Sequence, residues 1–193
     1  MGSGTTADRT NSAIEVILGR SSTKKFADTA VTQEQLEILL TAAVRAPDHG
    51  LIAPWRFTIL EGERRVLLGN AMAAALREKS PDADFDMLER EASKALRSPT
   101  LLVVSAVTQT HPKVPDIEQW VAVGAAIQNL WITAESLGLG VAWKTGSHAY
   151  STVVKSALGL APDEKIIGFV HVGTPVSKAP VRPADFSSRT RRL

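Results

Sequence analysis

The spacing of apolar residues predicts helices along most of the chain. In these segments apolar side chains recur every three or four residues, which places them on one face of a helix. The predicted helices cover 12–20, 32–44, 63–79, 84–97, 119–137 and 150–158. Ser12 with Glu15 and Thr32 with Gln35 each offer a capping box at a helix start. The segment 119–137 is apolar almost all round, which predicts a helix buried in the core.

Shorter segments rich in β-branched and aromatic residues predict strands between the helices. The predicted strands cover 55–60, 100–107, 141–145 and 165–173. The run 100–107 is nearly continuous in apolar residues, as expected of a central strand covered on both faces. A long buried helix beside a few strands, with helices on both sides, predicts an α+β or a three-layer αβα architecture.

Composition is that of one globular domain. The chain has 193 residues, 44% of them hydrophobic and 22% charged. We expect a single domain over 11–176, with 1–10 and 177–193 as terminal extensions. The net charge of +2 does not indicate a nucleic-acid partner. Because neither a signal peptide nor a long apolar run is recognisable, the expected location is the cytoplasm.

The residue inventory excludes several kinds of chemistry. The chain has no cysteine, which removes disulfides, thiolate nucleophiles and cysteine-bound metal clusters. A redox protein of this composition therefore needs a bound organic cofactor. The histidines His49, His111, His148 and His171 do not form the i, i+4 pair of a helical metal site. Neither a nucleophile elbow nor a P-loop pattern supports a hydrolase.

A cluster of cations and hydroxyls over 20–25 follows the first predicted helix. The residues Arg20, Ser21, Ser22, Thr23, Lys24 and Lys25 could together hold a phosphate through charge-assisted hydrogen bonds. Basic residues after a helix also interact favourably with its dipole and are often only solvated. The cluster alone leaves both interpretations open.

Two further segments could carry binding groups. The loop Arg45-Ala46-Pro47-Asp48-His49 is either a binding loop or an ordinary connection between a helix and a strand. Gly138 and Gly140 follow a helix, whereas a dinucleotide-binding fingerprint needs glycines that follow a strand and open a helix. We therefore interpret both glycines as helix C-caps.

Taken in order, these segments resemble the nitroreductase family, and more narrowly its short YdjA-like branch. The resemblance runs from about Ile14 to Pro175. It rests on motifs that are weak one by one and specific as an ordered set: Arg20-Ser21-Ser22, Arg45 to His49, Pro54-Trp55-Arg56-Phe57, the helix from Gly124 to Leu137, Trp143 to Gly146, and Gly168 to Pro175.

The resemblance implies an α+β fold with a central mixed or antiparallel sheet flanked by helices, in an intertwined homodimer with FMN at the subunit interface. Arg20 and Ser22 would contact the FMN phosphate and ribityl chain, while Arg45 and His49 would reach the flavin bound mainly by the partner subunit. The cofactor-binding residues implied in this way are Arg20, Ser21, Ser22, Arg45, His49, Thr133, Ala134, Glu135, Ser136, Leu137, Gly138, Trp143, Lys144 and Thr145.

The chain departs from the family pattern at two places. Ser21 replaces the family's second basic residue, which leaves Arg20, Lys24 or the tail residues Arg189, Arg191 and Arg192 to supply the charge. The loop before Pro54 reads Gly-Leu-Ile-Ala where many relatives carry Asn and Gln. This change predicts a more apolar substrate side of the pocket.

The activity implied by the resemblance is a ping-pong electron transfer from NADH or NADPH through FMN to a nitroaromatic, quinone or similar acceptor. A main-chain N–H near Thr145 or Gly146 would donate to flavin N5. The cofactor carries the chemistry, so we predict binding residues and no catalytic ones. Two alternatives stay open: a protein that binds FMN without turnover, and a dimerisation domain with an empty site.

Overall fold

The computed structural model describes residues 6–193, with side chains from residue 13 onward, and is built around one antiparallel sheet. Its strands are β1 (Trp55–Glu61), β2 (Thr100–Ala106), β3 (Gly140–Lys144) and β4 (Lys165–Gly173). Their order is β1-β2-β4-β3, and each neighbouring pair is antiparallel. Every residue of β2 is buried, which confirms the central strand predicted from its apolar run.

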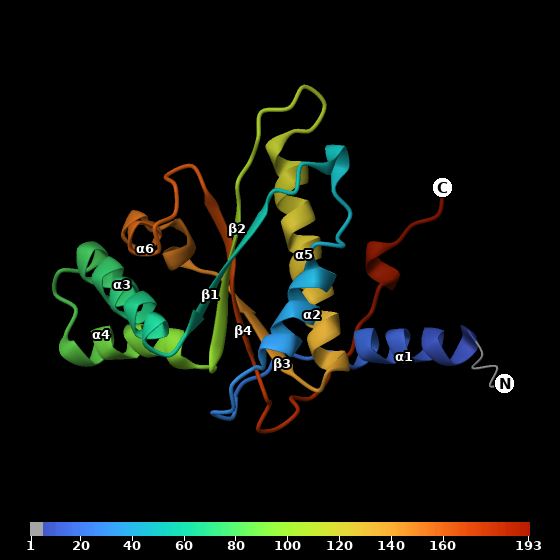
Figure 1. The fold of residues 1–193 in the computed structure, drawn as a ribbon, viewed down its shortest axis with the longest axis horizontal. Helices are drawn as coiled ribbons and strands as arrows, with labels where there is room; N and C mark the ends of the chain where they lie inside the picture. The colour runs from blue at the N-terminus through green and yellow to red at the C-terminus, as the bar shows by residue number, and fades with distance from the viewer. Residues whose placement is uncertain (1–5) are drawn as a thin grey trace.

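Helices cover both faces of this sheet, as Figure 1 shows. On one face lie α2 (Gln33–Ala43) and α5 (Asp116–Ser136), which pack against each other. On the other lie α3 (Glu63–Lys79), α4 (Phe85–Ala92) and α6 (Thr152–Ala157). The result is an α+β fold with three layers around an antiparallel sheet, as predicted in its broad form.

The alternation of side chains along the inner strands divides the core into two clusters. Successive residues of a strand point to opposite faces of the sheet. Leu102, Val104, Val170 and Val172 belong to the larger cluster, which α5 completes with Ile127 and Leu130. Leu101, Val103 and Phe169 belong to the smaller cluster, with Leu68 and Met72 of α3.

Most predicted element bounds hold within a few residues. The Thr32–Gln35 capping box is present: the Gln35 amide donates to Thr32 Oγ1 at 3.1 Å, and the Thr32 amide donates to Gln35 Oε1 at 3.0 Å. The first helix, α1 (Thr6–Gly19), starts before Ser12, whose side chain lies outside the described ones. The helix predicted over 84–97 continues beyond α4 only as a 3₁₀ turn.

The glycines after α5 have different roles. Gly138 has φ +74°, the left-handed conformation expected of a residue that ends a helix. Gly140 was also predicted to be a cap, and this is wrong because it opens β3. A Cβ at Gly140 would clash with Thr23 Oγ1. Gly140 therefore lets the segment after α1 lie directly on β3.

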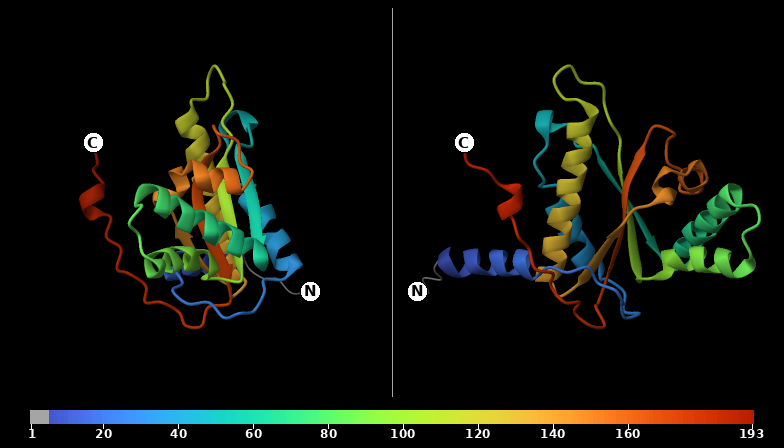
Figure 2. Two further views of the ribbon diagram at one scale, coloured as in Figure 1. Left: turned by 90° about the vertical axis from the view of Figure 1, so that its left-hand side faces the viewer. Right: turned by 180° about the vertical axis from the view of Figure 1, so that it is seen from behind.

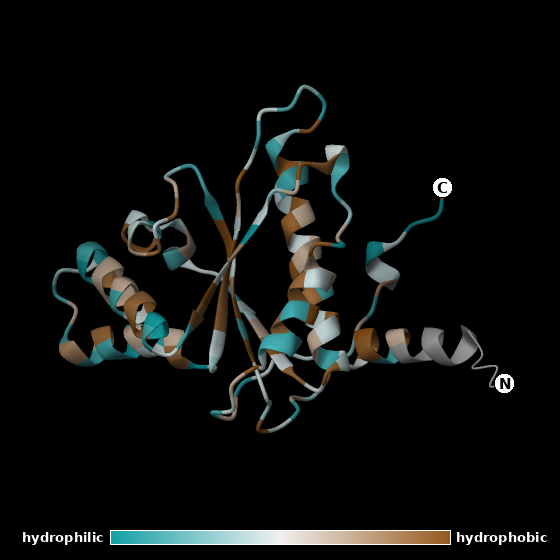
Figure 3. Ribbon diagram, in the orientation of Figure 1, coloured by the Kyte–Doolittle hydropathy of each residue, from teal (hydrophilic) through white to brown (hydrophobic). Residues whose placement is uncertain are grey.

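Helix α1 projects away from the three layers (Figures 1 and 2), and its last turn lies beside the C-terminal segment, with which it shares a cavity lining. Its apolar residues Ile14, Ile17 and Leu18 are exposed. Figure 3 colours the C-terminal end of α1 and much of α5 as hydrophobic. Ile117 and Val121 on α5 are also exposed. None of the helices in the described part of the chain is both long enough and apolar enough to cross a membrane.

Candidate functional site

The segment after α1, the β3 edge of the sheet and the C-terminal segment together enclose a cavity of about 880 Å³, which we call the basic cavity. This volume lies in the range of small-molecule and cofactor sites. The residues that line the basic cavity are Ile17, Leu18, Arg20, Ser21, Ser22, Thr23, Lys24, Phe26, Arg97, Ala142, Lys144, His171, Ala179, Pro180, Val181, Arg182, Pro183 and Ala184.

Backbone hydrogen bonds fix the walls of the basic cavity. The Thr23 amide donates to the Val141 carbonyl at 2.9 Å, which joins the segment after α1 to β3. The Ala27 amide donates to the Thr174 carbonyl at 2.8 Å and continues this connection. The Ser21 hydroxyl donates to the Ala179 carbonyl at 2.9 Å, which ties the C-terminal segment to the same wall.

The lining of the basic cavity is strongly one-sided in charge. It includes five basic side chains and, among the residues that the structure places around it, no carboxylate. The basic residues are Arg20, Lys24, Arg97, Lys144 and Arg182. The Arg20 guanidinium lies 4.4 Å from the centre of the Trp131 ring, a cation–π contact that orients it. Such a lining favours an anionic ligand that also has an apolar part.

A second, smaller cavity of about 260 Å³ adjoins the basic cavity; we call it the inner cavity. The two share Arg97, Lys144 and His171 as lining residues, so these side chains stand at the junction. The other residues of the inner cavity are Met72, Glu91, Lys94, Thr145, Gly146, Ser147, His148 and Phe169. A long ligand could therefore extend from one cavity into the other.

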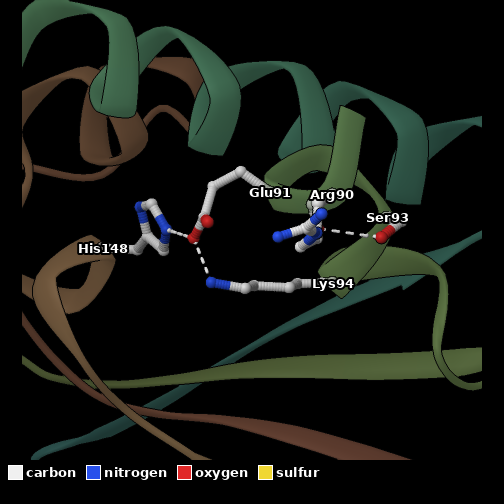
Figure 4. A network of polar contacts seen from close by, with 5 residues as sticks. All are labelled: Arg90, Glu91, Ser93, Lys94 and His148. Carbon is white, nitrogen blue, oxygen red and sulfur yellow. Dashed lines mark hydrogen bonds and ion pairs between the residues drawn. The ribbon is translucent and has the colours of Figure 1, made fainter. Parts of the chain in front are cut away.

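Three of the residues that line the inner cavity, Glu91, Lys94 and His148, belong to the polar network drawn in Figure 4. Glu91 Oε1 contacts both the Lys94 ammonium and His148 Nε2, the latter at 2.5 Å. Burial disfavours the charged form of Glu91, but the hydrogen bonds from His148 and Lys94 outweigh this and lower its pKa. Beside it, the Ser93 hydroxyl donates to the Arg90 carbonyl at 2.8 Å. The network joins α4 to the turn that follows β3.

His171 is the buried imidazole at the junction of the two cavities. It is only 3% exposed, and its Nδ1 lies 2.9 Å from the Ser98 hydroxyl. Burial, with the nearby charges of Arg97 and Lys144, lowers the pKa of His171 to about 4. The side chain is therefore neutral near pH 7.

The structure brings part of the predicted site together. Arg20, Ser21, Ser22 and Lys144 line the basic cavity, and Thr145 lines the inner cavity. The Trp143 side chain lies on the opposite face of the sheet, where its Nε1 donates to the Ile167 carbonyl at 3.2 Å. Trp143 lines neither cavity.

Other predicted residues lie away from these cavities within one chain. The end of α5 and the turn after it contain Thr133, Ala134, Glu135, Ser136, Leu137 and Gly138, and none of these lines either cavity. The Ala134 side chain is fully buried in the core. Arg45 is exposed at the end of α2.

His49 lines a separate cavity of about 320 Å³ with Asp48 and with the α5 residues Glu118 and Val121. Its Nδ1 lies 2.6 Å from Glu118 Oε2. The loop after His49 has left-handed backbone at Leu51 (φ 53°) and Ala53 (φ 50°), a conformation that costs energy in residues other than glycine. Such strain is common in binding loops.

Sequence reasoning missed Arg97, Arg182 and His171 as cavity residues. Arg97 follows the helical segment that precedes the central strand, and Arg182 lies in a segment predicted to be a terminal extension. The tail residues Arg189, Arg191 and Arg192, considered as sources of charge, do not line the basic cavity. The sequence around Arg182 has no pattern that predicts a cavity residue, because the position of Arg182 depends on how the C-terminal segment packs against the cavity.

The sequence is similar to those of known nitroreductase-like proteins. Residues 17–174 match the model of the "Nitroreductase family". The chain is 35% identical over 172 residues to "Putative NAD(P)H nitroreductase YdjA" of Escherichia coli K12, covering 86% of this chain and 90% of the relative. It is 28% identical over 174 residues to "5,6-dimethylbenzimidazole synthase" of Rhodospirillum rubrum, covering 84% of this chain and 81% of the relative.

Solved structures show the same fold. A nitroreductase-like family protein from Bacillus cereus superposes with a TM-score of 0.80 at 26% identity, covering 94% of this chain and 95% of the other. A Desulfovibrio desulfuricans structure described as a nitroreductase in complex with FMN gives a TM-score of 0.75 at 19% identity, covering 94% and 96%. The matched segment contains the sheet, α5 and the segment after α1, and by this match the chain belongs to the nitroreductase family.

Proposed function

We propose that this protein is an FMN-dependent oxidoreductase that uses NADH or NADPH to reduce a nitroaromatic, a quinone or a similar acceptor. The observation that carries the proposal is the basic cavity, with five cations and no carboxylate in its described lining. FMN combines a phosphate with a largely apolar ring, which suits this mixture of basic and apolar residues. The similarity to an NAD(P)H nitroreductase of Escherichia coli supports the choice of nitroreductase chemistry.

The residues present fit such a cofactor. Arg20, Lys24 and Arg182 would hold the phosphate, and Ser22 would contribute a hydroxyl. Phe26 and Ala142 supply apolar wall. The polar atoms of Lys144 and of the turn after it would border the ring, with a main-chain N–H near Thr145 or Gly146 as the donor to N5.

When bound, FMN supplies the redox chemistry that connects oxidation of a reduced nicotinamide with reduction of the acceptor. The chain's own residues bind and orient the reactants. The Glu91 network holds the turn after β3 in place, because His148 belongs to that turn and Glu91 to α4. We assign no side chain as an acid, base or nucleophile. We propose a ping-pong order, in which the nicotinamide leaves before the acceptor binds.

We also propose a homodimer in which the partner completes the site. Exposed apolar residues on α1 and α5, such as Leu18 at 68% and Val121 at 64%, form surfaces that a second copy would cover. Arg45, His49 and the end of α5 would then reach the partner's cofactor. Light scattering coupled to gel filtration tests this, and a monomer that retains bound FMN would contradict it.

A visible absorbance spectrum of the purified protein, before and after anaerobic NADH or NADPH, tests the activity. Flavin bands that bleach on addition of the nicotinamide are expected. Flavin bands that persist with both reductants would favour a protein that binds FMN without turnover. Absence of flavin bands even after reconstitution with FMN would refute the proposal and support a dimerisation domain with an empty site.

A further inference from the structure

His171 lies inside the Gly168 to Pro175 motif but was not among the predicted site residues, and it stands at the junction of the two cavities. Its position on β4 pairs it with Leu101 of β2 and Ala142 of β3. Because side chains alternate along a strand, His171 shares the face of Phe169 and points away from α5. A polar side chain here is directed at whatever fills the junction.

The hydrogen-bond geometry at Ser98 fixes the imidazole tautomer. The Ser98 hydroxyl lies 2.7 Å from the Thr100 carbonyl and 2.9 Å from His171 Nδ1. A hydroxyl has one hydrogen, and the carbonyl can only accept, so this hydrogen goes to Thr100. His171 Nδ1 must then carry a hydrogen and donate it to Ser98, which leaves Nε2 with a lone pair.

The free lone pair faces the cavities. Ser98 is buried and lines neither cavity, so the Nδ1 edge of the ring points into the protein. The other edge, which bears Nε2, is the part that reaches the junction. Within the described chain no protein group is hydrogen-bonded to Nε2. The neutral state of the ring, held by burial and by Arg97 and Lys144, keeps this nitrogen an acceptor.

The order of groups along the two cavities indicates which part of a cofactor would meet His171. Arg20, Lys24 and Arg182 occur only in the lining of the basic cavity, at the end suited to phosphate. The turn residues Thr145 and Gly146 occur only in the inner cavity, at the end suited to the ring. His171 lies between them, and in FMN the group between phosphate and ring is the ribityl chain with its hydroxyls.

We propose that His171 Nε2 accepts a hydrogen bond from a ribityl hydroxyl of the bound flavin, so that His171 positions the polyol chain between the phosphate and ring sites. This inference rests on the proposed function, since it needs FMN in the cavities. It assigns His171 as a positioning residue for the cofactor, with Ser98 fixing its tautomer.

Two substitutions separate the two ring nitrogens. The amide of a glutamine reaches the position of Nε2, whereas that of an asparagine reaches only the position of Nδ1. His171→Gln can therefore offer an acceptor to the cavity, while His171→Asn can contact only Ser98. We expect His171→Gln to bind FMN about as tightly as the unaltered protein. His171→Asn should weaken binding by roughly 3- to 10-fold, the equivalent of one hydrogen bond between neutral groups.

The affinities are measured by quenching of flavin fluorescence with the cofactor-free protein. Lumiflavin, which has the ring but lacks the polyol, is the control ligand, and it should bind both variants equally. Equal FMN affinity of the two variants, or the same loss with lumiflavin as with FMN, would overturn the ribityl contact. A protein that binds no FMN in any form would refute the proposed function itself, which keeps the two failures distinct.

NMR of the histidine ring nitrogens gives a readout that does not depend on the variants folding. In the protein without ligand, Nε2 of His171 should show the resonance of an unprotonated nitrogen. On addition of FMN this resonance should move toward that of a hydrogen-bond acceptor while Nδ1 stays protonated. A resonance that is unmoved by FMN, or a proton found on Nε2, would overturn the proposal.

Discussion

The two faces of the sheet differ in what their side chains contact, although both are formed by the same strands. On β4, Val170 and Val172 point to α5 and are fully buried among apolar side chains. On the other face Phe169 belongs to the smaller apolar cluster, but the next residue on that face, His171, lines both cavities. The face toward α5 is apolar and stabilises the fold. The opposite face is apolar where α3 covers it and polar near β3, where the two cavities lie.

The difference shows how an alternating strand separates stability from binding. Substitutions on the α5 face should alter the free energy of unfolding and leave ligand preference unchanged. Substitutions at the cavities should alter affinity or pH dependence at a smaller cost in stability. The variants that follow test this separation.

The largest effect is expected for Leu130→Ala on the α5 face. Leu130 is 0% exposed in the larger cluster, and removal of a buried leucine side chain costs about 2–5 kcal/mol. Leu67→Ala, at a 49% exposed position on α3, is the matched control and should change stability by less than about 1 kcal/mol. Equilibrium unfolding in urea, at one protein concentration and with FMN in excess, measures both. Similar losses in the two variants would show that the α5 face does not dominate stability.

The next effect is a pH dependence that arises from His171. Its pKa is lowered to about 4 in the folded protein, from a usual value of 6.5. Between these values the unfolded chain binds a proton that the folded chain does not, so stability falls as the pH falls from 6.5 to 4. Each tenfold difference in proton affinity between the two states corresponds to about 1.4 kcal/mol, so the loss is at most a few kcal/mol.

Unfolding measured across this pH range should show that His171→Gln flattens the decline. His111→Gln is the matched control, because His111 is exposed. The contribution of Glu91, whose pKa is lowered from 4.5, has the same sign but falls at lower pH. A decline that persists unchanged in His171→Gln would show that His171 is not held neutral by the fold.

A smaller and more selective effect is expected for Arg20→Ala at the basic cavity. Loss of a hydrogen bond between charged groups costs about 1.5–3 kcal/mol, which is roughly a 10- to 100-fold rise in Kd for FMN. Riboflavin, which has no phosphate, should lose much less. Arg189→Ala is the control, since Arg189 does not line the basic cavity. An equal loss for Arg189→Ala would mean that the loss of affinity is not specific to the basic cavity, and this would contradict the assignment of Arg20 to the phosphate.

Local sequence patterns predicted the helices and strands, but they did not predict which side chains line the cavities. The strands, the buried α5 and the Thr32–Gln35 cap follow from local patterns, and the structure has them. That Arg20 and Lys144 belong to one site was predicted from the resemblance alone, and both line the basic cavity. His171 was not predicted, because a histidine in an apolar strand has the same local pattern whether it faces a core or a cavity. Only the tertiary arrangement, which places Arg97, the tail and the turn after β3 around His171, decides between the two.

The smallest effect is expected for Ser21→Ala, which tests whether the C-terminal segment is part of the site. The Ser21 hydroxyl donates to the Ala179 carbonyl at 2.9 Å and so ties the segment 179–184 to the wall of the basic cavity. Loss of one such hydrogen bond costs about 0.5–1.5 kcal/mol. We expect faster tryptic cleavage after Lys178, and faster release of FMN, with little change in global stability. Ser187→Ala is the control, because its hydroxyl bonds only to Asp185 in the same turn. If trypsin cleaves Ser21→Ala no faster than this control, other contacts hold the tail, and Arg182 reaches the cavity without the Ser21 hydrogen bond.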